Sequence, residues 1–222
     1  MISAIILAAG ESRRMGVKNK LLLPISGEVL IRNFVKSVCA SNVSEVVVVV
    51  GHEADKIEEV LQGQPVQFVE NINYMEGMTS SIQAGIQAAS EESEGLMICL
   101  SDQPFIETSD FNRLIHEFTD LFDSESSLII VPVFKGQRGN PVLFSRQFRN
   151  IILQHKGEGC RGIIQNHQEC IREVTMENDN VLKDVDTLED YKLFFTDQNS
   201  IIWNQMTKNF IANYKLILNH YL

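Results

Sequence analysis

The sequence lacks several features that would assign it to a class at once. No run of about 18 uncharged apolar residues occurs, so no membrane-spanning helix is expected. No basic stretch followed by a long apolar one precedes the first expected strand, which gives no indication of a signal peptide. Positive charge is also in short supply. The formal net charge of −10 argues against nucleic-acid binding, so any phosphate site must be a local cationic pocket in an acidic molecule.

Cysteines are few and scattered. The four thiols form no CxxC pair and no ladder with histidines; they are Cys39, Cys99, Cys160 and Cys170. A zinc site is therefore not expected. We interpret the cysteines as small buried apolar residues, and the reduced cytoplasm as the natural compartment.

The 222-residue length suits one α/β domain, and 44% hydrophobic residues can form its core without disulfides. We expect residues 1–195 to form this domain. Residues 196–222 lie beyond it and carry apolar residues at three- and four-residue spacing. This pattern predicts an amphipathic helix docked on the domain or on a second subunit. A membrane-surface role is weaker, because only Lys208 and Lys215 supply cations to the polar face.

Short apolar runs predict buried strands. They are continuous rather than alternating, as a sheet covered on both faces requires. The main runs are Ser3–Ala8, Glu45–Val50, Val66–Val69, Leu96–Leu100 and Leu128–Val133, with less regular strands at Pro141–Phe144 and Cys170–Met176.

Helical patterns occur between these strands. Apolar residues recur at three- and four-residue spacing over 30–38, 82–89 and 111–122, and 146–153 is a further helix candidate. Thr108 and Ser109 are plausible N-caps of the third helix. The alternation predicts right-handed βαβ units, hence a Rossmann-like three-layer α/β sandwich with a mostly parallel sheet. Ligands of such sheets bind at the carboxyl ends of the strands.

The loop from Leu7 to Lys20 gives the strongest indication of function. Small residues at a strand end let the backbone approach a ligand, and their amides can point at anionic oxygens. The guanidinium of Arg14 and the ammonium of Lys20 could neutralise a triphosphate and its leaving pyrophosphate. The alternative is a solvated basic loop with a glycine turn. The nucleotide-binding candidates here are Leu7, Ala8, Ala9, Gly10, Ser12, Arg14, Gly16 and Lys20, of which Arg14 and Lys20 are also catalytic candidates.

Two familiar nucleotide motifs are missing from this loop. No GKS or GKT follows the glycines, so the loop is not a Walker A sequence. Gly10 and Gly16 are six residues apart, with Arg13 and Arg14 between them, so the loop is not GxGxxG either. The spacing argues against an NAD- or FAD-binding oxidoreductase.

The stretch LAAGESRRMGVKNKLLLP resembles the signature loop of the MobA-like NTP transferases, which include the molybdenum cofactor guanylyl- and cytidylyltransferases. The form LAAGxSxRMG is similar to the cytidylyltransferase branch, whereas the guanylyltransferase branch tends to carry a second glycine where Ala9 stands. The resemblance runs from Met1 to about Phe195. It implies a fold of the nucleotide-diphospho-sugar transferase type and NMP transfer from an NTP.

Two further stations match the family in order. Gly77 begins GMTSSI at an expected loop-to-helix junction, where the hydroxyls could simply cap the helix. The resemblance places a GMxxS segment against the nucleotide base and ribose, which selects Gly77 and Ser81. Asp102 ends the fourth strand within DQP, where a carboxylate is well placed to hold Mg²⁺ against phosphates; a turn aspartate is the alternative. The family's DxP motif makes Asp102 a catalytic residue, a nucleotide contact and a metal ligand, and Gln103 again resembles the cytidylyltransferase branch.

A second acidic station lies near the end of the domain. Asp184 and Asp186 would face the same side if they lie in a strand. Thr187 and Asp190 have the spacing of a capping box. The match to the family's DxDTxED motif implies that Asp186 is the second Mg²⁺ ligand and that Asp184 supports it, with phosphate oxygens and water completing the octahedron.

The acceptor candidates rest on resemblance alone. GQRGNP resembles a GxRGxP segment in which His is common at the position of Asn140, and as residues it could be a bare turn. GEGCR resembles GDxGxR, with Glu158 in place of Asp. The resemblance assigns Arg138, Asn140 and Arg161 to the acceptor, which in the cytidylyltransferases is the phosphate of the molybdenum-loaded pterin.

The sequence thus predicts a cytoplasmic, Mg²⁺-dependent nucleotidyltransferase that uses CTP or another NTP. Expected partners are a molybdopterin-type acceptor and a molybdoenzyme or maturation factor, without nucleic acid or membrane. Two alternatives stay open: a sugar phosphate as acceptor, or a nucleotide-binding oxidoreductase on a related fold. A non-catalytic partner protein is less favoured, because acidic stations occur at both ends of the chain.

Overall fold

The computed structural model describes residues 1–15, 19–25, 27–122 and 127–195. Its main sheet has the strand order β10-β7-β9-β6-β1-β4-β5, with β8 paired to β7. The strands are β1 (Ile2–Ala8), β4 (Glu45–Val50), β5 (Gln67–Glu70), β6 (Gly95–Leu100), β7 (Ile129–Phe134), β8 (Gln137–Arg138), β9 (Val142–Ser145) and β10 (Ile171–Thr175). A separate antiparallel pair joins β2 (Pro24–Ile25) to β3 (Glu28–Val29).

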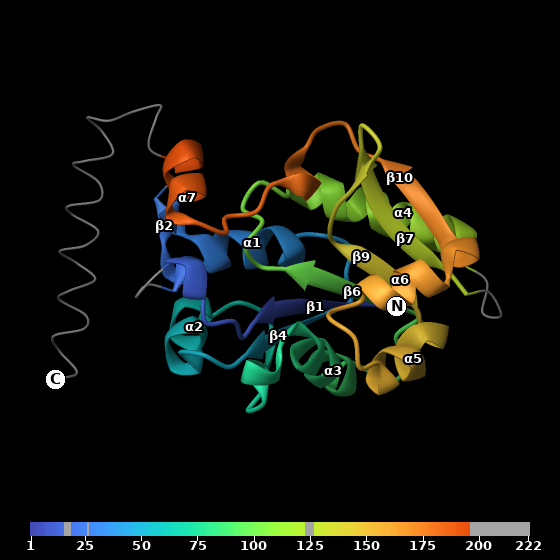
Figure 1. Ribbon diagram of the computed structural model, residues 1–222, viewed down its shortest axis with the longest axis horizontal. Helices are drawn as coiled ribbons and strands as arrows, with labels where there is room; N and C mark the ends of the chain where they lie inside the picture. The colour runs from blue at the N-terminus through green and yellow to red at the C-terminus, as the bar shows by residue number, and fades with distance from the viewer. Residues whose placement is uncertain (16–18, 26, 123–126, 196–222) are drawn as a thin grey trace, which may run out of the picture.

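Parallel pairing dominates the sheet, as predicted. β1 lies between β4 and β6 and is parallel to both, while β9 runs antiparallel to β6 and to β7. The arrowheads of β1 and β6 point toward the side of the molecule where α7 (Leu188–Phe195) and the β2–β3 pair lie (Figure 1). This side is therefore where the ligand rule places chemistry.

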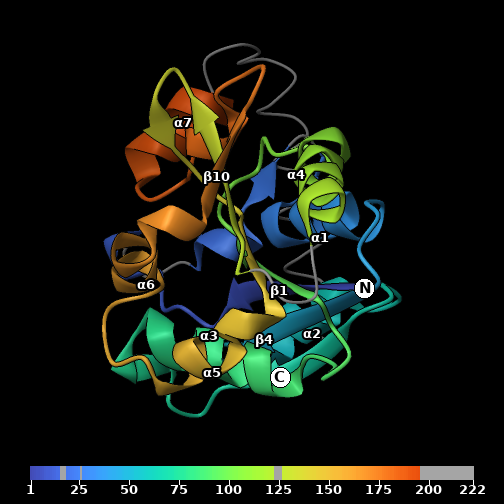
Figure 2. The same cartoon turned by 90° about the vertical axis from the view of Figure 1, so that its right-hand side faces the viewer.

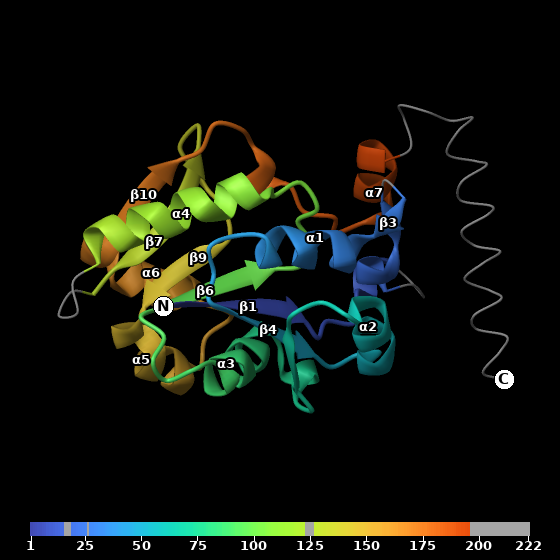
Figure 3. The ribbon, with the colours of Figure 1, turned by 180° about the vertical axis from the view of Figure 1, so that it is seen from behind.

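Helices cover both faces of the sheet. One face carries α1 (Leu30–Cys39), α2 (Ala54–Leu61) and α4 (Thr108–Leu121), whose buried residues share one apolar cluster with the even-numbered residues of β1 and β4. The other carries α3 (Met78–Ala88), α5 (Arg149–Gln154) and α6 (Arg161–Asn166), whose buried residues share a second cluster with the odd-numbered residues of β1 and β4. In the side and rear views α1 and α4 lie on one side of the central strands and α3 and α5 on the other (Figures 2 and 3). The three-layer sandwich is confirmed.

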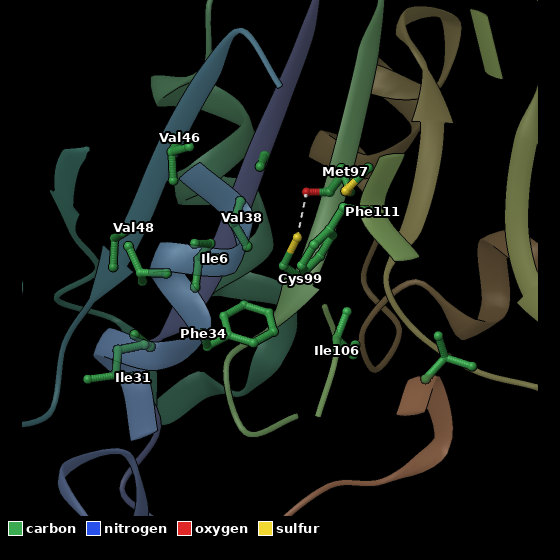
Figure 4. Packing of buried hydrophobic residues seen from close by; sticks show 14 of the residues in the cluster. Ile6, Ile31, Phe34, Val38, Val46, Val48, Met97, Cys99, Ile106 and Phe111 are labelled. Atoms are coloured by element: carbon green, nitrogen blue, oxygen red, sulfur yellow. Dashed lines mark hydrogen bonds between the residues drawn. The ribbon is translucent and has the colours of Figure 1, made fainter. Parts of the chain in front are cut away.

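The core explains the continuous apolar runs. Every residue from Val46 to Val50 is buried, because alternate side chains enter the clusters on opposite faces of the sheet. Phe34 and Phe111 meet edge to face at 5.9 Å between ring centroids, and Cys99 lies beside them (Figure 4). Cys99 fits the predicted role of a small apolar residue, whereas the other three cysteines are only partly buried.

Two local expectations differ from the structure. Helix α2 follows β4 but was not expected, since its short segment ADKIEEVL contributes only Ile57 and Leu61 to the core. The expected caps of α4 are wrong: Glu107 is the N-cap and exchanges hydrogen bonds with Asp110 in a capping box. The hydroxyl of Thr108 instead donates to the carbonyl of Ser37, 3.0 Å away on α1.

Helix α3 lies unusually close to the sheet. A side chain at Gly85 would collide with Ile5 of β1 and Val49 of β4, so glycine is needed there. This close contact fixes the distance between α3 and the sheet, and so helps to position the N-terminus of the helix, which begins at Met78. Within the described ranges, no helix combines the length and apolar character needed to cross a bilayer.

Candidate active site

A cleft of about 690 Å³ opens at the carboxyl ends of β1 and β6. Most of the predicted stations contribute side chains to it. Its lining comes from residues of the segments 7–14, 20–21, 74–81, 100–102 and 184–186, together with Glu158 and Arg161. Motifs separated by more than a hundred residues in the chain therefore share one cavity.

The loop after β1 is shaped by its own polar side chains. Ser12 adopts a left-handed backbone with φ of 53°, and its carbonyl accepts a hydrogen bond from Met15 N at 2.8 Å. Its hydroxyl accepts from Lys20 N at 3.1 Å, which closes the loop. Asn19, which sequence reasoning missed, is buried and accepts from Leu21 N at 3.1 Å, so it begins a 3₁₀ turn at Lys20. An Asn before an apolar run was the available signal.

Most of the predicted nucleotide contacts of this loop reach the cleft. Leu7, Ala9, Gly10 and Ser12 line it, whereas Ala8 is fully buried and faces the core. Gly16 lies outside the described residues. Most of the loop residues predicted to contact the nucleotide therefore line the cleft, and most of them have small side chains.

The clearest feature of the cleft is a lysine shared by two aspartates. Lys20 Nζ lies 2.6 Å from Asp102 Oδ2 and 2.9 Å from Asp186 Oδ1. The side chains of Lys20 and Asp102 are only 15% and 19% exposed, so water screens this pair weakly. Burial alone lowers the pKa of Lys20, but attraction to Asp102 and Asp186, and the hydrogen bonds that Lys20 donates to them, outweigh burial and raise that pKa. The lysine therefore stays charged at neutral pH.

Arg14 completes this arrangement from outside. Its Nη1 lies 2.6 Å from Asp186 Oδ2, and its side chain is 74% exposed. Such an exposed pair contributes little to folding stability. Arg14 is consequently free to exchange Asp186 for an anionic ligand that enters from solvent.

Backbone and side-chain hydrogen bonds bring the two acidic stations together. Val185 N donates to Asp102 O at 2.9 Å, and Gln103 Nε2 donates to Val181 O at 3.0 Å. The amide of Asn140 donates to the same carbonyl at 3.1 Å. The condition under which Asp184 and Asp186 would face the same side, a strand, is not met: residues 183–186 follow irregular backbone, and the Asp102 loop supplies the partner of Val185 N.

Asp184 also lines the cleft and interacts electrostatically with Asp102, Asp186 and Lys20. Burial, then repulsion from Asp102 and Asp186, raises its pKa above the usual range for an aspartate. Downstream, Thr187 and Asp190 form the predicted capping box: Thr187 N donates to Asp190 Oδ2 at 2.8 Å, and Asp190 N donates to Thr187 Oγ1 at 3.1 Å. The box lies at the start of α7, which begins at Leu188, two residues after Asp186. It therefore helps to fix the backbone next to Asp186.

These aspartates suit a hard divalent cation. Both already share one cation, and Oδ1 of Asp102 is buried with no hydrogen-bond partner in the described part of the chain. Carboxylate oxygens are the ligands that Mg²⁺ prefers, and it keeps several waters or phosphate oxygens besides. No group of three or more His, Cys, Asp or Glu side chains in the described ranges could hold a metal by itself. The residues fit a metal that arrives with phosphates.

The opposite end of the cleft belongs to α3. Gly77 is the N-cap with φ of 110°, and none of the nearby hydroxyls caps the helix. Ser81 is 6% exposed, lines the cleft and accepts from Asn71 Nδ2 at 3.0 Å. Tyr74, Met75 and Met78 also line the cleft and were not predicted; isolated apolar residues beside a glycine gave no signal.

The predicted acceptor residues are not gathered in one place. Arg161 lines the cleft together with Glu158. Arg138 lies outside the lining, with Nε 2.8 Å from Glu173 Oε1 and Nη2 3.3 Å from Gln168 Oε1. Asn140 also lies outside the lining and precedes a cis peptide bond to Pro141.

Comparison with known proteins assigns the chain to a family. Residues 4–171 match the model of the MobA-like NTP transferase domain. The chain belongs to the MobA-like NTP transferase family. The match covers the Lys20 and Asp102 stations and stops before Asp184, so the second acidic station rests on the structure.

Two curated relatives span nearly the whole domain. The purine catabolism protein PucB of Bacillus subtilis is 30% identical over 199 residues, 85% of this chain and 93% of that protein. The nicotine blue oxidoreductase of Paenarthrobacter nicotinovorans is 26% identical over 192 residues, with the same shares. Proteins with unlike names thus share this family.

Solved structures show the fold. A nucleotidyl transferase from Methanothermobacter thermautotroptrophicus superposes with a TM-score of 0.75 at 24% identity, over 88% of this chain and 96% of that one. A Mycobacterium tuberculosis protein solved in complex with manganese has a TM-score of 0.71 at 20% identity, over 88% and 98%. The MobA-like chain therefore has the nucleotidyltransferase fold.

Proposed function

We propose that this MobA-like protein transfers CMP from CTP to the molybdenum-loaded pterin cofactor and releases pyrophosphate. The observation that carries the proposal is Lys20 held between Asp102 and Asp186 at the strand ends. This arrangement places a buried cation and two carboxylates where the fold binds ligands. A metal–triphosphate complex needs both kinds of group within a few ångströms.

The chemistry asks little of the protein beyond position and charge. An oxygen of the acceptor phosphate attacks the α-phosphorus of CTP, and the bond to the oxygen that bridges to the β-phosphorus breaks. Lys20 and Arg14 then neutralise the triphosphate and the departing pyrophosphate. No side chain is needed as a general base, because an acceptor phosphate is already ionised at neutral pH. Asp102 and Asp186 would hold Mg²⁺, which draws charge from the phosphate oxygens.

The choice of cytosine rests on resemblance. Ala9 lines the cleft, where a glycine would leave more room for the base. Gln103 is buried and bonded to Val181, so its bearing on the nucleotide is indirect. For the acceptor, Arg161 is the better placed of the two arginines, since Arg138 lies in an ion pair with Glu173.

The metal has an independent argument. The manganese complex of the Mycobacterium tuberculosis protein concerns a chain of the same fold. Together with the unpartnered Oδ1 of Asp102, it supports a divalent cation in this protein. We propose Mg²⁺ for that ion, the cytoplasm as its setting, and a molybdoenzyme or maturation factor as recipient of the product.

Pyrophosphate release tests the proposal directly. The purified protein is incubated with Mg²⁺ and CTP, GTP or UTP, with and without the molybdenum-loaded pterin. Release only with CTP and the pterin is expected. The same nucleotide should raise the melting temperature most. A bound ligand adds about RT ln(1 + [L]/Kd) to the free energy of unfolding. Release with a sugar phosphate in place of the pterin would keep the reaction class and change the acceptor.

A second candidate comes from the relative named nicotine blue oxidoreductase, which matches most of the chain. An oxidoreductase of this kind would bind NAD(P)H in the same cleft. The absence of a GxGxxG loop argues against it. A fluorescence titration with NADH and NADPH separates the two: saturable binding, together with no pyrophosphate release, would replace the transferase proposal.

A further inference from the structure

Three faces of helix α3 contact three different parts of the molecule: the sheet, the cleft and the loop that follows α5. Ile82, Gly85 and Ile86 are buried, and the glycine lies against the sheet. Met78 and Ser81, near its start, line the cleft. Thr79 and Gln83 are four residues apart, so they share a face. That face meets the loop between α5 and α6.

Thr79 holds this loop with a single hydroxyl. Its Oγ1 donates to the carbonyl of Gly157 and accepts a hydrogen bond from Gly159 N at 2.9 Å. Both partners are backbone groups of the loop, and both belong to glycines, Gly157 and Gly159. Glycine-rich backbone loses much conformational entropy on ordering, so it keeps one conformation only when such bonds hold it.

Gln83 anchors the start of the same loop. Its Nε2 lies 2.9 Å from the carbonyl of His155 and 3.1 Å from those of Ile152 and Leu153. Ile152 and Leu153 belong to the last turn of α5, whose carbonyls lack i+4 donors within the helix, and His155 is its C-cap residue. Thr79 and Gln83 therefore fasten residues 152–159 to α3 at two successive points.

Glu158 of this loop and Arg161, the first residue of α6 directly after it, line the cleft on this side. We propose that Thr79 is a positioning residue for the acceptor, acting through the loop that bears Glu158 and leads into α6 at Arg161. That this wall binds the acceptor rests on the proposed function. An acceptor suited to it carries an anionic group for Arg161 and hydrogen-bond donors for Glu158. Because α3 also bears Ser81, the nucleotide and acceptor walls are held as one unit.

The test uses Thr79→Val, which keeps the shape of the side chain and removes the hydroxyl, and Thr79→Ser, which keeps the hydroxyl. The first readout is tryptic cleavage after Lys156, measured on the native protein. We expect Thr79→Val to be cleaved about 10-fold faster, since local opening becomes easier. Its KM for the acceptor should rise about 10-fold with the KM for CTP unchanged, because misplacement acts on one substrate. Thr79→Ser should restore both values.

A matched control is Thr119→Val on α4, whose hydroxyl donates only within its own helix, to Ile115 O at 2.8 Å. It should change neither readout. Equal cleavage rates of wild type and Thr79→Val would overturn the inference, and so would an equal rise of both KM values. If Thr79→Val speeds cleavage while the wild type transfers no nucleotide to any acceptor, the proposed function fails and the hold of Thr79 on the loop stands.

Discussion

The two walls of the cleft are built in different ways. On one wall, Lys20, Asp102, Asp186 and Arg14 come from distant segments and meet at 2.6–2.9 Å, beside strand ends. On the other, Glu158 and Arg161 stand at a glycine-rich loop that α3 holds through Thr79 and Gln83. The first wall has the precision that charge neutralisation at a reacting phosphorus requires. The second can change its charged residues without disturbing the sheet, which suits a site that selects the acceptor.

Asp102→Asn should have the largest effect. The substitution preserves shape but removes the negative charge that a divalent cation needs. We expect transfer to fall about 10³-fold or more, since several kcal/mol of charge stabilisation is lost. Calorimetric titration with Mn²⁺ and the nucleotide should show binding lost as well. Asp120→Asn on α4, far from the cleft, is the control; an equal loss in both variants would remove Asp102 from the site.

Lys20→Met should follow, with a loss of about 10²- to 10³-fold in kcat, typical of removing one donor from a developing charge. The binding of CTP should weaken less than the turnover. Lys36→Met removes the same charge from a half-exposed lysine of α1 that pairs with Glu28, and it should be near wild type. Full turnover of Lys20→Met in the pyrophosphate assay would reduce the lysine to a structural counter-ion.

Arg161→Ala and Arg138→Ala sharpen the comparison on the acceptor wall. We expect Arg161→Ala to raise the KM for the acceptor about 10-fold, a typical loss for one charge-assisted hydrogen bond. Arg138→Ala breaks an exposed pair with Glu173 and should change that KM little. Steady-state kinetics at saturating CTP measures both. The reverse order would return Arg138 to the acceptor site that the sequence predicts for it.

Gln103→Leu should have the smallest effect, and on stability first. It leaves Val181 O with the Asn140 amide alone and loses a buried hydrogen bond worth about 1 kcal/mol. We expect the melting temperature to fall by about 2–4 °C. Any loss of transfer should be in kcat, through a displaced Asp186. A normal melting temperature with altered nucleotide preference would instead make Gln103 a specificity residue.

The order of motifs along the chain was enough to predict most of the first wall. Lys20 and Asp102 follow strands that periodicity identifies, and parallel strands bring their carboxyl ends to one edge. Asp186 was assigned by resemblance to the DxDTxED motif, and it lies in irregular backbone rather than in a strand. Its position depends on Val185 N reaching Asp102 O, a contact between irregular segments that no local pattern encodes.

The second wall was harder to predict. Arg138, Asn140 and Arg161 look equivalent in the sequence, since each is a polar residue in a glycine-bearing loop. In the structure Arg138 of β8 is paired with Glu173 of β10, on the far side of the strand β7 that lies between them. Thr79 could be interpreted only as a helix cap, and its loop partners lie about 80 residues further along the chain.

By itself the sequence determined the buried parallel strands, the layers and the places where polar residues follow the strand ends. These features can be predicted because apolar periodicity and glycine act on the local backbone conformation. Only the tertiary structure decided which polar residues meet. Lys20 finds Asp102 and Asp186, Arg138 finds Glu173, and Thr79 finds a loop. Hydrogen bonds between irregular segments depend on how the whole core packs, so their partners become defined only when the sheet and its two helical layers are complete.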